Sequence, residues 1–110
     1  MKQVLILGAG KSSIYIIDRL IEHQSQWNIQ VMVADMSIEN LEARVGNKPA
    51  RKILLESGTA EEIETLFTSE SIVISMLPAF MHIEMAKLCL KYKCHLITPS
   101  YISEAMQALD

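Results

Sequence analysis

The stretch from Val4 to Gly10 constrains the fold of this chain more than any other part of the sequence. Residues 4–7 (VLIL) form an uninterrupted run of β-prone apolar residues, and the loop Gly8-Ala9-Gly10 follows directly. An apolar run without alternating polar residues is typical of a strand buried on both faces, as in a parallel sheet covered by helices on each side. We therefore expect an α/β fold whose first strand ends at a glycine loop.

The rest of the sequence alternates between helix and strand patterns. Apolar residues recur at helical spacing from Ser12 to about Glu22, and the polar stretch 23–26 then closes this helix. Further strands are predicted at residues 29–34, 52–55, 71–76 and 95–98, and further helices at residues 37–45, 60–67, 79–92 and 102–109. Ser37 and Thr59 stand where the first two of these helices need an N-cap. Because crossovers between parallel strands are right-handed, this order predicts a doubly wound parallel sheet in three α/β/α layers, the Rossmann fold.

Composition and charge exclude several classes of function. The 110 residues, half of them hydrophobic, suit a single domain with its own core. The formal net charge is −3 and the basic residues are scattered, so no surface for nucleic acid or an anionic membrane is expected. Neither a signal sequence nor an apolar run of roughly 18 residues is present, so we expect a cytoplasmic protein. Cys89 and Cys94 form no Cys-x-x-Cys pair, and His23 and His95 lack partners at metal-ligand spacing, so no metal site is expected.

The glycine loop predicts a binding site for a dinucleotide pyrophosphate. Gly8 permits a tight turn after the strand, and Gly10 lets the backbone approach the phosphates without an intervening side chain. The following helix offers free N–H groups and the positive end of its dipole to the anion. Lys11 and Ser12 are candidates for additional donors, and Ser13 takes the third fingerprint position, where a small residue packs the helix against the strand. The alternative is that the two glycines form an ordinary turn.

Asp35 decides which cofactor the sequence favours. It ends the second predicted strand, where a carboxylate accepts hydrogen bonds from both hydroxyls of the adenosine ribose. A carboxylate at this position repels a 2′-phosphate, and no arginine follows within the next few residues. We therefore expect NAD rather than NADP. In the other interpretation, Asp35 only begins a turn with Ser37.

Residues after the fourth and fifth predicted strands are candidates for the nicotinamide side of the site. Leu77 and Pro78 follow the fourth strand, at the crevice where the ligand of such a sheet lies. His82 is near enough in sequence to be considered for proton transfer, although a lone histidine on a helix is more often a surface or packing residue. Ser100 and Tyr101 follow the fifth strand, where the alternatives are a helix cap for Ser100 and packing for Tyr101. We assign no catalytic residue from these patterns.

Several of these segments together resemble the cofactor domain of the saccharopine dehydrogenase (saccharopine reductase) family. The resemblance rests on the glycine loop 8–10, on 75–78 (SMLP) with His82, on 95–103 (HLITPSYIS) and on 105–110 (AMQALD). It implies a Rossmann domain that precedes a larger substrate and dimerisation domain. It also implies an enzyme of lysine metabolism, which interconverts saccharopine with an amino acid and a semialdehyde by hydride transfer to NAD or NADP. Ser100 and Tyr101 would then lie close to the nicotinamide or the substrate.

Three positions depart from the pattern of that family. Ser13 stands at the variable third fingerprint position, and Pro99 replaces a more usual threonine. Residues 57–59 (SGT) stand where an Asp-bearing turn commonly touches the adenine. These departures concern the adenine pocket rather than the fold.

The sequence leaves more than one functional hypothesis. The leading one is the NAD-binding domain of a saccharopine dehydrogenase-like oxidoreductase that acts on an amino-acid-derived secondary amine. In this interpretation residues 1–110 are part of a longer dehydrogenase and are not active alone. A C-terminal substrate domain is then needed for activity, and the protein is a possible homodimer. The main alternative is a stand-alone nucleotide-sensing Rossmann module without catalysis, such as those that regulate potassium transport. A third is a Rossmann fold that serves only in assembly, with no affinity for nucleotides.

Overall fold

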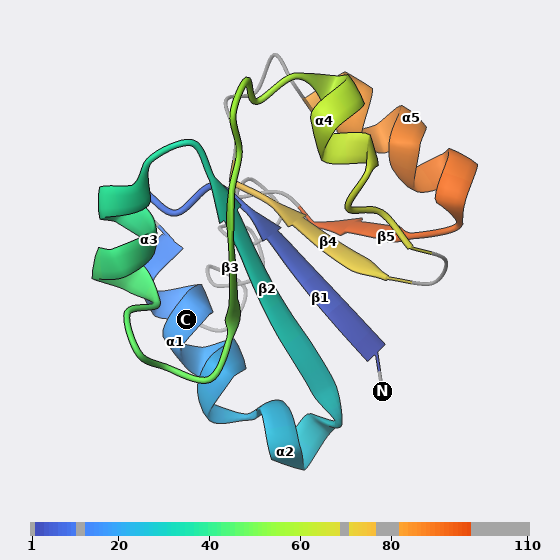
Figure 1. Ribbon diagram of the computed structural model, residues 1–110. Coiled ribbons are helices and arrows are strands. Elements are labelled where there is room, and N and C mark those ends of the chain that lie inside the picture. Colours follow the sequence, from blue (N-terminus) through green and yellow to red (C-terminus); the bar gives the residue numbers. More distant parts are fainter. Residues whose placement is uncertain (1, 11–12, 69–70, 77–81, 98–110) are drawn as a thin grey trace, which may run out of the picture.

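The computed structural model describes residues 2–10, 13–68, 71–76 and 82–97, and these contain a five-stranded sheet (Figure 1). The strands are β1 (Lys2–Leu7), β2 (Ile29–Asp35), β3 (Arg51–Leu54), β4 (Ile72–Ser75) and β5 (His95–Ile97). Their order is β3-β2-β1-β4-β5, and every neighbouring pair is parallel. This is the predicted doubly wound α/β sheet.

Helices cover both faces of the sheet (Figure 1). On one side lie α1 (Ile14–Glu22) and α3 (Ile38–Arg44), and on the other lie α4 (Ala60–Glu64) and α5 (His82–Tyr92). The short helix α2 (Gln24–Trp27) stands between α1 and the start of β2. The three predicted layers are therefore present.

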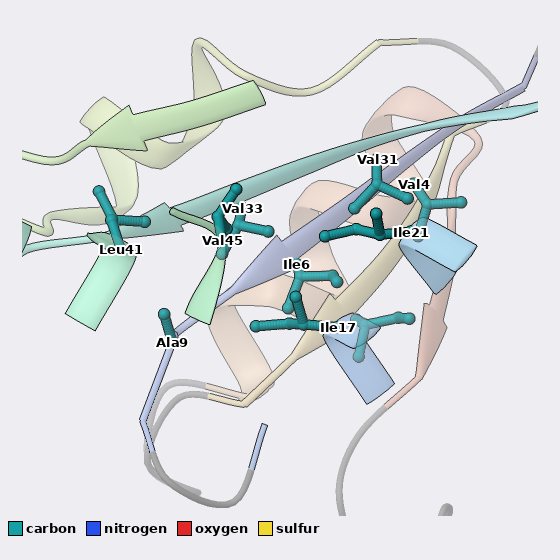
Figure 2. Close-up of a cluster of buried hydrophobic side chains, with 10 residues drawn as sticks. Val4, Ile6, Ala9, Ile17, Ile21, Val31, Val33, Leu41 and Val45 are labelled. Carbon is teal, nitrogen blue, oxygen red and sulfur yellow. The ribbon is translucent and has the colours of Figure 1, made fainter. Parts of the chain in front are cut away.

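The central strand β1 sends its side chains alternately into two cores. Val4 and Ile6 belong to the cluster formed with α1 and α3, which Figure 2 shows. Leu5 and Leu7 belong to the cluster formed with α4 and α5. All four side chains are buried, so neither face of β1 tolerates a polar residue. This two-sided burial is the physical reason for the uninterrupted apolar run.

The register of the sheet brings the ends of three strands together. Leu7, the last residue of β1, pairs with Ala34 of β2 on one side and with Ser75 of β4 on the other. The chain turns at Gly8 directly after this point, between the ends of its two neighbours. The order of the strands reverses here, between β1 and β4, and such a switch point is where ligands of open α/β sheets bind.

One element differs from its prediction because of contacts that sequence periodicity does not show. Helix α2 occupies the polar stretch that was expected to close the first helix. The Gln24 amide donates to the carbonyl of Pro49 at 2.6 Å and accepts from the N–H of Val31 at 2.8 Å. The helix ends at Trp27, and its C-cap Asn28 has a left-handed φ of 52°. Side-chain bonds to distant backbone therefore give this polar segment its structure.

The remaining differences concern the ends of elements. Helix α4 ends at Glu64, three residues before the predicted end, and β3 is displaced by one residue toward the N-terminus. The first residues of the predicted helix 79–92 and the whole of the predicted helix 102–109 lie outside the described residues. In the part of the chain that the structure describes, no helix has the length and apolar character needed to cross a bilayer.

Candidate functional site

The two glycines of the loop after β1 occupy different surroundings. Gly8 has a φ of +99°, and its N–H donates to the carbonyl of Ala34 at 2.8 Å. A Cβ on Gly8 would lie 3.3 Å from the backbone carbon and oxygen of Met76. Among the described residues, a Cβ on Gly10 would meet nothing within 4 Å. Gly8 is therefore needed for the turn, whereas Gly10 leaves open space beside the backbone, as a pyrophosphate site requires.

Hydrogen bonds hold the loop at the N–H of Ala9 and at the carbonyl of Gly10. The N–H of Ala9 donates to Asp35 Oδ2 at 2.6 Å. The carbonyl of Gly10 accepts from the N–H of Ser13 at 3.0 Å and from Ser13 Oγ at 2.6 Å. Ser13 is fully buried, so its hydroxyl is satisfied by the loop itself. This bond explains how serine fits at the third fingerprint position.

Asp35 connects the glycine loop with the turn that follows β2. While its Oδ2 accepts from Ala9, its Oδ1 accepts from the N–H of Ser37 at 2.7 Å. Ser37 in turn caps α3, since its hydroxyl accepts from the N–H of Asn40 at 3.2 Å. The bond from Ser37 agrees with the interpretation that Asp35 begins a turn, and the contact between Asp35 and the ribose hydroxyls stays a prediction. Each carboxylate oxygen has a second lone pair, so ribose hydroxyls can still bind there.

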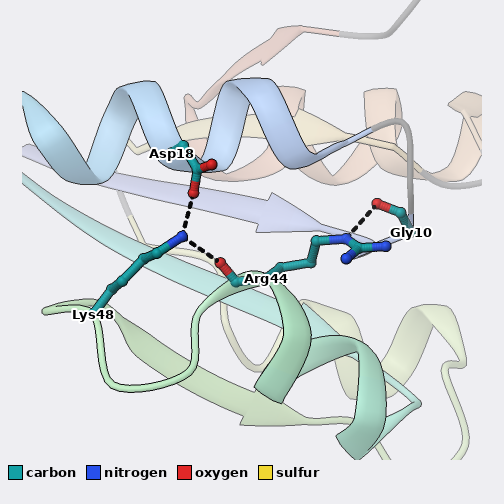
Figure 3. A network of polar contacts seen from close by, with 4 residues as sticks. All are labelled: Gly10, Asp18, Arg44 and Lys48. Carbon is teal, nitrogen blue, oxygen red and sulfur yellow. Dashed lines mark hydrogen bonds and ion pairs between the residues drawn. The ribbon is translucent and has the colours of Figure 1, made fainter.

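Arg44 also reaches the loop, which the sequence did not reveal. Its Nε donates to the carbonyl of Gly10 at 3.2 Å, across 34 residues of sequence (Figure 3). Lys48 joins the same network, because its Nζ donates to Asp18 Oδ1 at 2.5 Å and to the carbonyl of Arg44 at 3.3 Å. The absence of an arginine directly after Asp35 therefore did not exclude an arginine from the loop. No local pattern could have predicted this contact, because it depends on how α3 packs beside α1.

The turn after β3 is organised by one carboxylate. Glu62 accepts from the backbone N–H groups of Glu56 at 2.7 Å, Ser57 at 2.9 Å and Gly58 at 2.9 Å. Gly58 has a φ of +65° and lies against Met36, the residue after Asp35. Residues 57–59 therefore form an ordered turn beside the end of β2, where the family pattern has its adenine contact.

The backbone bonds from Glu56, and then from Ser57 and Gly58, hold the pKa of Glu62 below its ordinary value of 4.5. A carboxyl group with a lowered pKa in the folded state stabilises the protein above its unfolded pKa, and this contribution is lost as the pH falls through the folded value. We expect Glu62→Gln to lower the urea midpoint at neutral pH, and this deficit to shrink as the pH falls below 4.5. Glu61→Gln, on the same turn of α4, is the matched control. A deficit that stays constant across the acid range would contradict this account.

The nicotinamide side of the predicted site is described only in part. Ser75 is fully buried at the end of β4, and its hydroxyl has no hydrogen-bond partner among the described residues. His82 is the first residue of α5. The other candidates for this side lie outside the described residues and stay predictions; they are Leu77, Pro78, Ser100 and Tyr101. The same holds for Lys11 and Ser12, the candidate donors to the phosphates. Within the described ranges, no group of three His, Cys, Asp or Glu side chains is placed to hold a metal ion.

The family model for the saccharopine dehydrogenase NADP binding domain matches residues 4–110. The chain belongs to this family. The resemblance noted in the sequence is thereby confirmed, and the matched range includes the glycine loop and Asp35. The family description names NADP, whereas we expected NAD; what the two share is a nicotinamide dinucleotide.

Relatives of the saccharopine dehydrogenase family match nearly the whole chain. Bovine mitochondrial alpha-aminoadipic semialdehyde synthase is 34% identical over 113 residues, covering 99% of this chain and 12% of that protein. Saccharopine dehydrogenase [NADP(+), L-glutamate-forming] from Saccharomyces cerevisiae is 28% identical, covering 99% of this chain and 24% of that protein. The apo structure of saccharopine dehydrogenase (L-Glu forming) from the same yeast matches with a TM-score of 0.77 and 28% identity, over 100% of this chain and 24% of that one. The chain thus spans between an eighth and a quarter of the length of these relatives.

Proposed function

We propose that this chain is the dinucleotide-binding part of a saccharopine dehydrogenase-like oxidoreductase. The observation that carries the proposal is the glycine loop at the switch point, held by Asp35 and Ser13 with open space beside Gly10. A loop that already has its binding shape loses less conformational freedom when the ligand arrives. Membership of the family supports the same conclusion.

In the proposed complex, each part of the site has a separate task. The pyrophosphate lies beside Gly10 at the start of α1, where backbone N–H groups and the helix dipole favour an anion. The adenosine ribose lies at Asp35, and the nicotinamide extends across the crevice toward the end of β4. When bound, the cofactor gives or takes a hydride at the carbon next to the substrate's secondary amine. The residues of this chain bind and orient it.

We propose that the substrate binds mainly to residues outside the 110 described by this sequence. The longer relatives carry names that include saccharopine dehydrogenase and alpha-aminoadipic semialdehyde synthase, and most of their length lies outside the matched region. We propose that a substrate domain follows this one and that the 110 residues alone do not turn over saccharopine. The expected cytoplasmic location and a homodimer stay predictions.

We propose NAD as the preferred cofactor. The Asp35 carboxylate repels a 2′-phosphate, and residues 36–43 contain two glutamates and no cation. The family description and the name of the yeast relative favour NADP instead. Arg44 is a cation that the structure places at the glycine loop, where its Nε donates to the carbonyl of Gly10. It would favour NADP if its Nη groups also reached the 2′-phosphate.

Calorimetric titration with NADH and NADPH tests both parts of this proposal. We expect NADH to bind at least about tenfold more tightly, a difference of about 1.4 kcal/mol, and Asp35→Ala to lose this preference. Glu22→Ala is the matched control, because Glu22 is an exposed carboxylate at the end of α1 that lies away from the glycine loop. Tighter binding of NADPH to the native chain would overturn the NAD assignment. If neither nucleotide binds, the glycine loop is only a turn and the proposed function fails.

A further inference from the structure

We propose that Arg44 is a positioning residue of the dinucleotide site, which fixes the glycine loop by holding the carbonyl of Gly10. This inference rests on the proposed function, because it concerns how the same loop receives the cofactor. It adds to the glycine fingerprint a residue from α3 that neither the motif nor the family resemblance includes.

The carbonyl of Gly10 accepts three hydrogen bonds, and they differ in origin. The N–H and the hydroxyl of Ser13, at 3.0 and 2.6 Å, belong to the same turn as the carbonyl. Arg44 Nε, at 3.2 Å, comes from the last residue of α3. Among the described residues, Arg44 is therefore the one donor that connects this carbonyl to another element of the fold.

Arg44 is itself well placed for this role (Figure 3). Its side chain is half-buried and runs along α1 to the loop, while its own carbonyl accepts from Lys48, which also bonds Asp18 on α1. In the part of the chain that the structure describes, none of the ion pairs includes the Arg44 guanidinium. The hydrogen bond from Arg44 to Gly10 is thus not a by-product of an ion pair.

Holding this carbonyl matters for binding because of the geometry of the peptide group. A trans peptide is planar, with its C=O and N–H pointing in opposite directions. A donor that fixes the carbonyl of Gly10 therefore restrains rotation of that peptide plane at the proposed phosphate site. Asp35 does the corresponding work at the N–H of Ala9. Asp35 thus holds the N–H of Ala9 and Arg44 holds the carbonyl of Gly10, so the two side chains restrain this dipeptide at both ends.

Three substitutions separate the hydrogen bond from the charge. Arg44→Met removes the donor while keeping an unbranched side chain. Arg44→Gln puts an amide nitrogen at the same number of bonds from Cα as Nε, without the positive charge. Lys52→Met is the matched control, because Lys52 is a cation of the same region whose partner is Glu42 rather than the loop. Thermal unfolding of each variant verifies that it is folded at the temperature of the binding measurements.

The readouts are calorimetric affinity for NADH and for NADPH, and amide hydrogen exchange at Ser13. We expect Arg44→Met to weaken both nucleotides by about five- to tenfold and to speed exchange at Ser13. Arg44→Gln is expected to restore both affinities to within about threefold of the native chain, and Lys52→Met to change neither.

Other outcomes overturn the inference in different ways. Unchanged affinities in Arg44→Met would show that the bond to Gly10 has no part in binding. A loss confined to NADPH would make Arg44 a ligand of the 2′-phosphate, and an equal loss in Arg44→Gln would assign the effect to charge. If the native chain binds neither nucleotide, it is the proposed function that fails, and the role of Arg44 in binding fails with it.

Discussion

Gly10→Ala should leave the domain as stable as the native chain while lowering its affinity for NADH and NADPH by at least about tenfold. A Cβ at this position meets none of the described residues within 4 Å, so we expect the folded protein to accommodate the methyl group without strain. The same methyl group projects into the open space where the pyrophosphate is proposed to lie. Bringing a methyl group against the phosphates forces them away from the N–H groups at the start of α1. Calorimetry measures the affinity, and urea denaturation measures the stability.

The two measurements on Gly10→Ala separate binding from folding. An unchanged affinity in a folded variant would move the phosphates away from Gly10 and remove the main support for the proposed binding mode. A large loss of stability would show that the space beside Gly10 is needed by the fold itself. Only the combination of full stability and weak binding agrees with the structure.

Gly8→Ala should give the opposite result, with the free energy of unfolding lowered by about 2–3 kcal/mol. At a φ of +99° an alanine is strained, and its Cβ would press on the backbone of Met76 at 3.3 Å. The turn cannot easily rotate to relieve this strain, because the N–H of Gly8 donates to the carbonyl of Ala34. In a domain of this size, such a loss corresponds to a fall in melting temperature of roughly 10 °C.

Gly10→Ala serves as the control for Gly8→Ala, since both add one methyl group to the same loop. Urea denaturation of the two variants and the native chain, under identical conditions, makes the comparison. If the stability of Gly8→Ala were within about 0.5 kcal/mol of the native value, the turn would be able to relax and the conformation at Gly8 would not be required.

Much of the fold follows from short-range patterns that tertiary contacts do not alter. The apolar run of β1 indicated burial on both faces, which the two cores confirm. Ser37 and Thr59 were recognisable as caps, because a cap bonds an N–H only three residues further on. Helix α2 was not predictable in this way, since Gln24 makes its bonds to Pro49 and Val31, on other parts of the chain.

The candidate site shows the same division between local and distant contacts. Gly8, Gly10 and Asp35 stand at positions fixed by strand ends, so their spacing in sequence indicated their place in space. Arg44 acts on the backbone of a segment 34 residues away, and such a partner has no sequence signature. Glu62 stands three residues after the cap Thr59, which is the spacing of a capping box, and this pattern could have indicated that its carboxylate reaches back to the turn before α4. The sequence also gave no indication that both oxygens of Asp35 would be engaged by backbone N–H groups.

The hydrogen-bond partners of the glycine loop share one further property. Ala34, Asp35, Ser13 and Arg44 all belong to the α1, β2 and α3 region, which follows the loop without interruption in the sequence. The part of the proposed site that would hold the ribose and the pyrophosphate thus lies within one continuous stretch, residues 8–44. If the proposed binding mode holds, substitutions within this stretch can change the preference between NAD and NADP while the ends of β4 and β5 stay as they are.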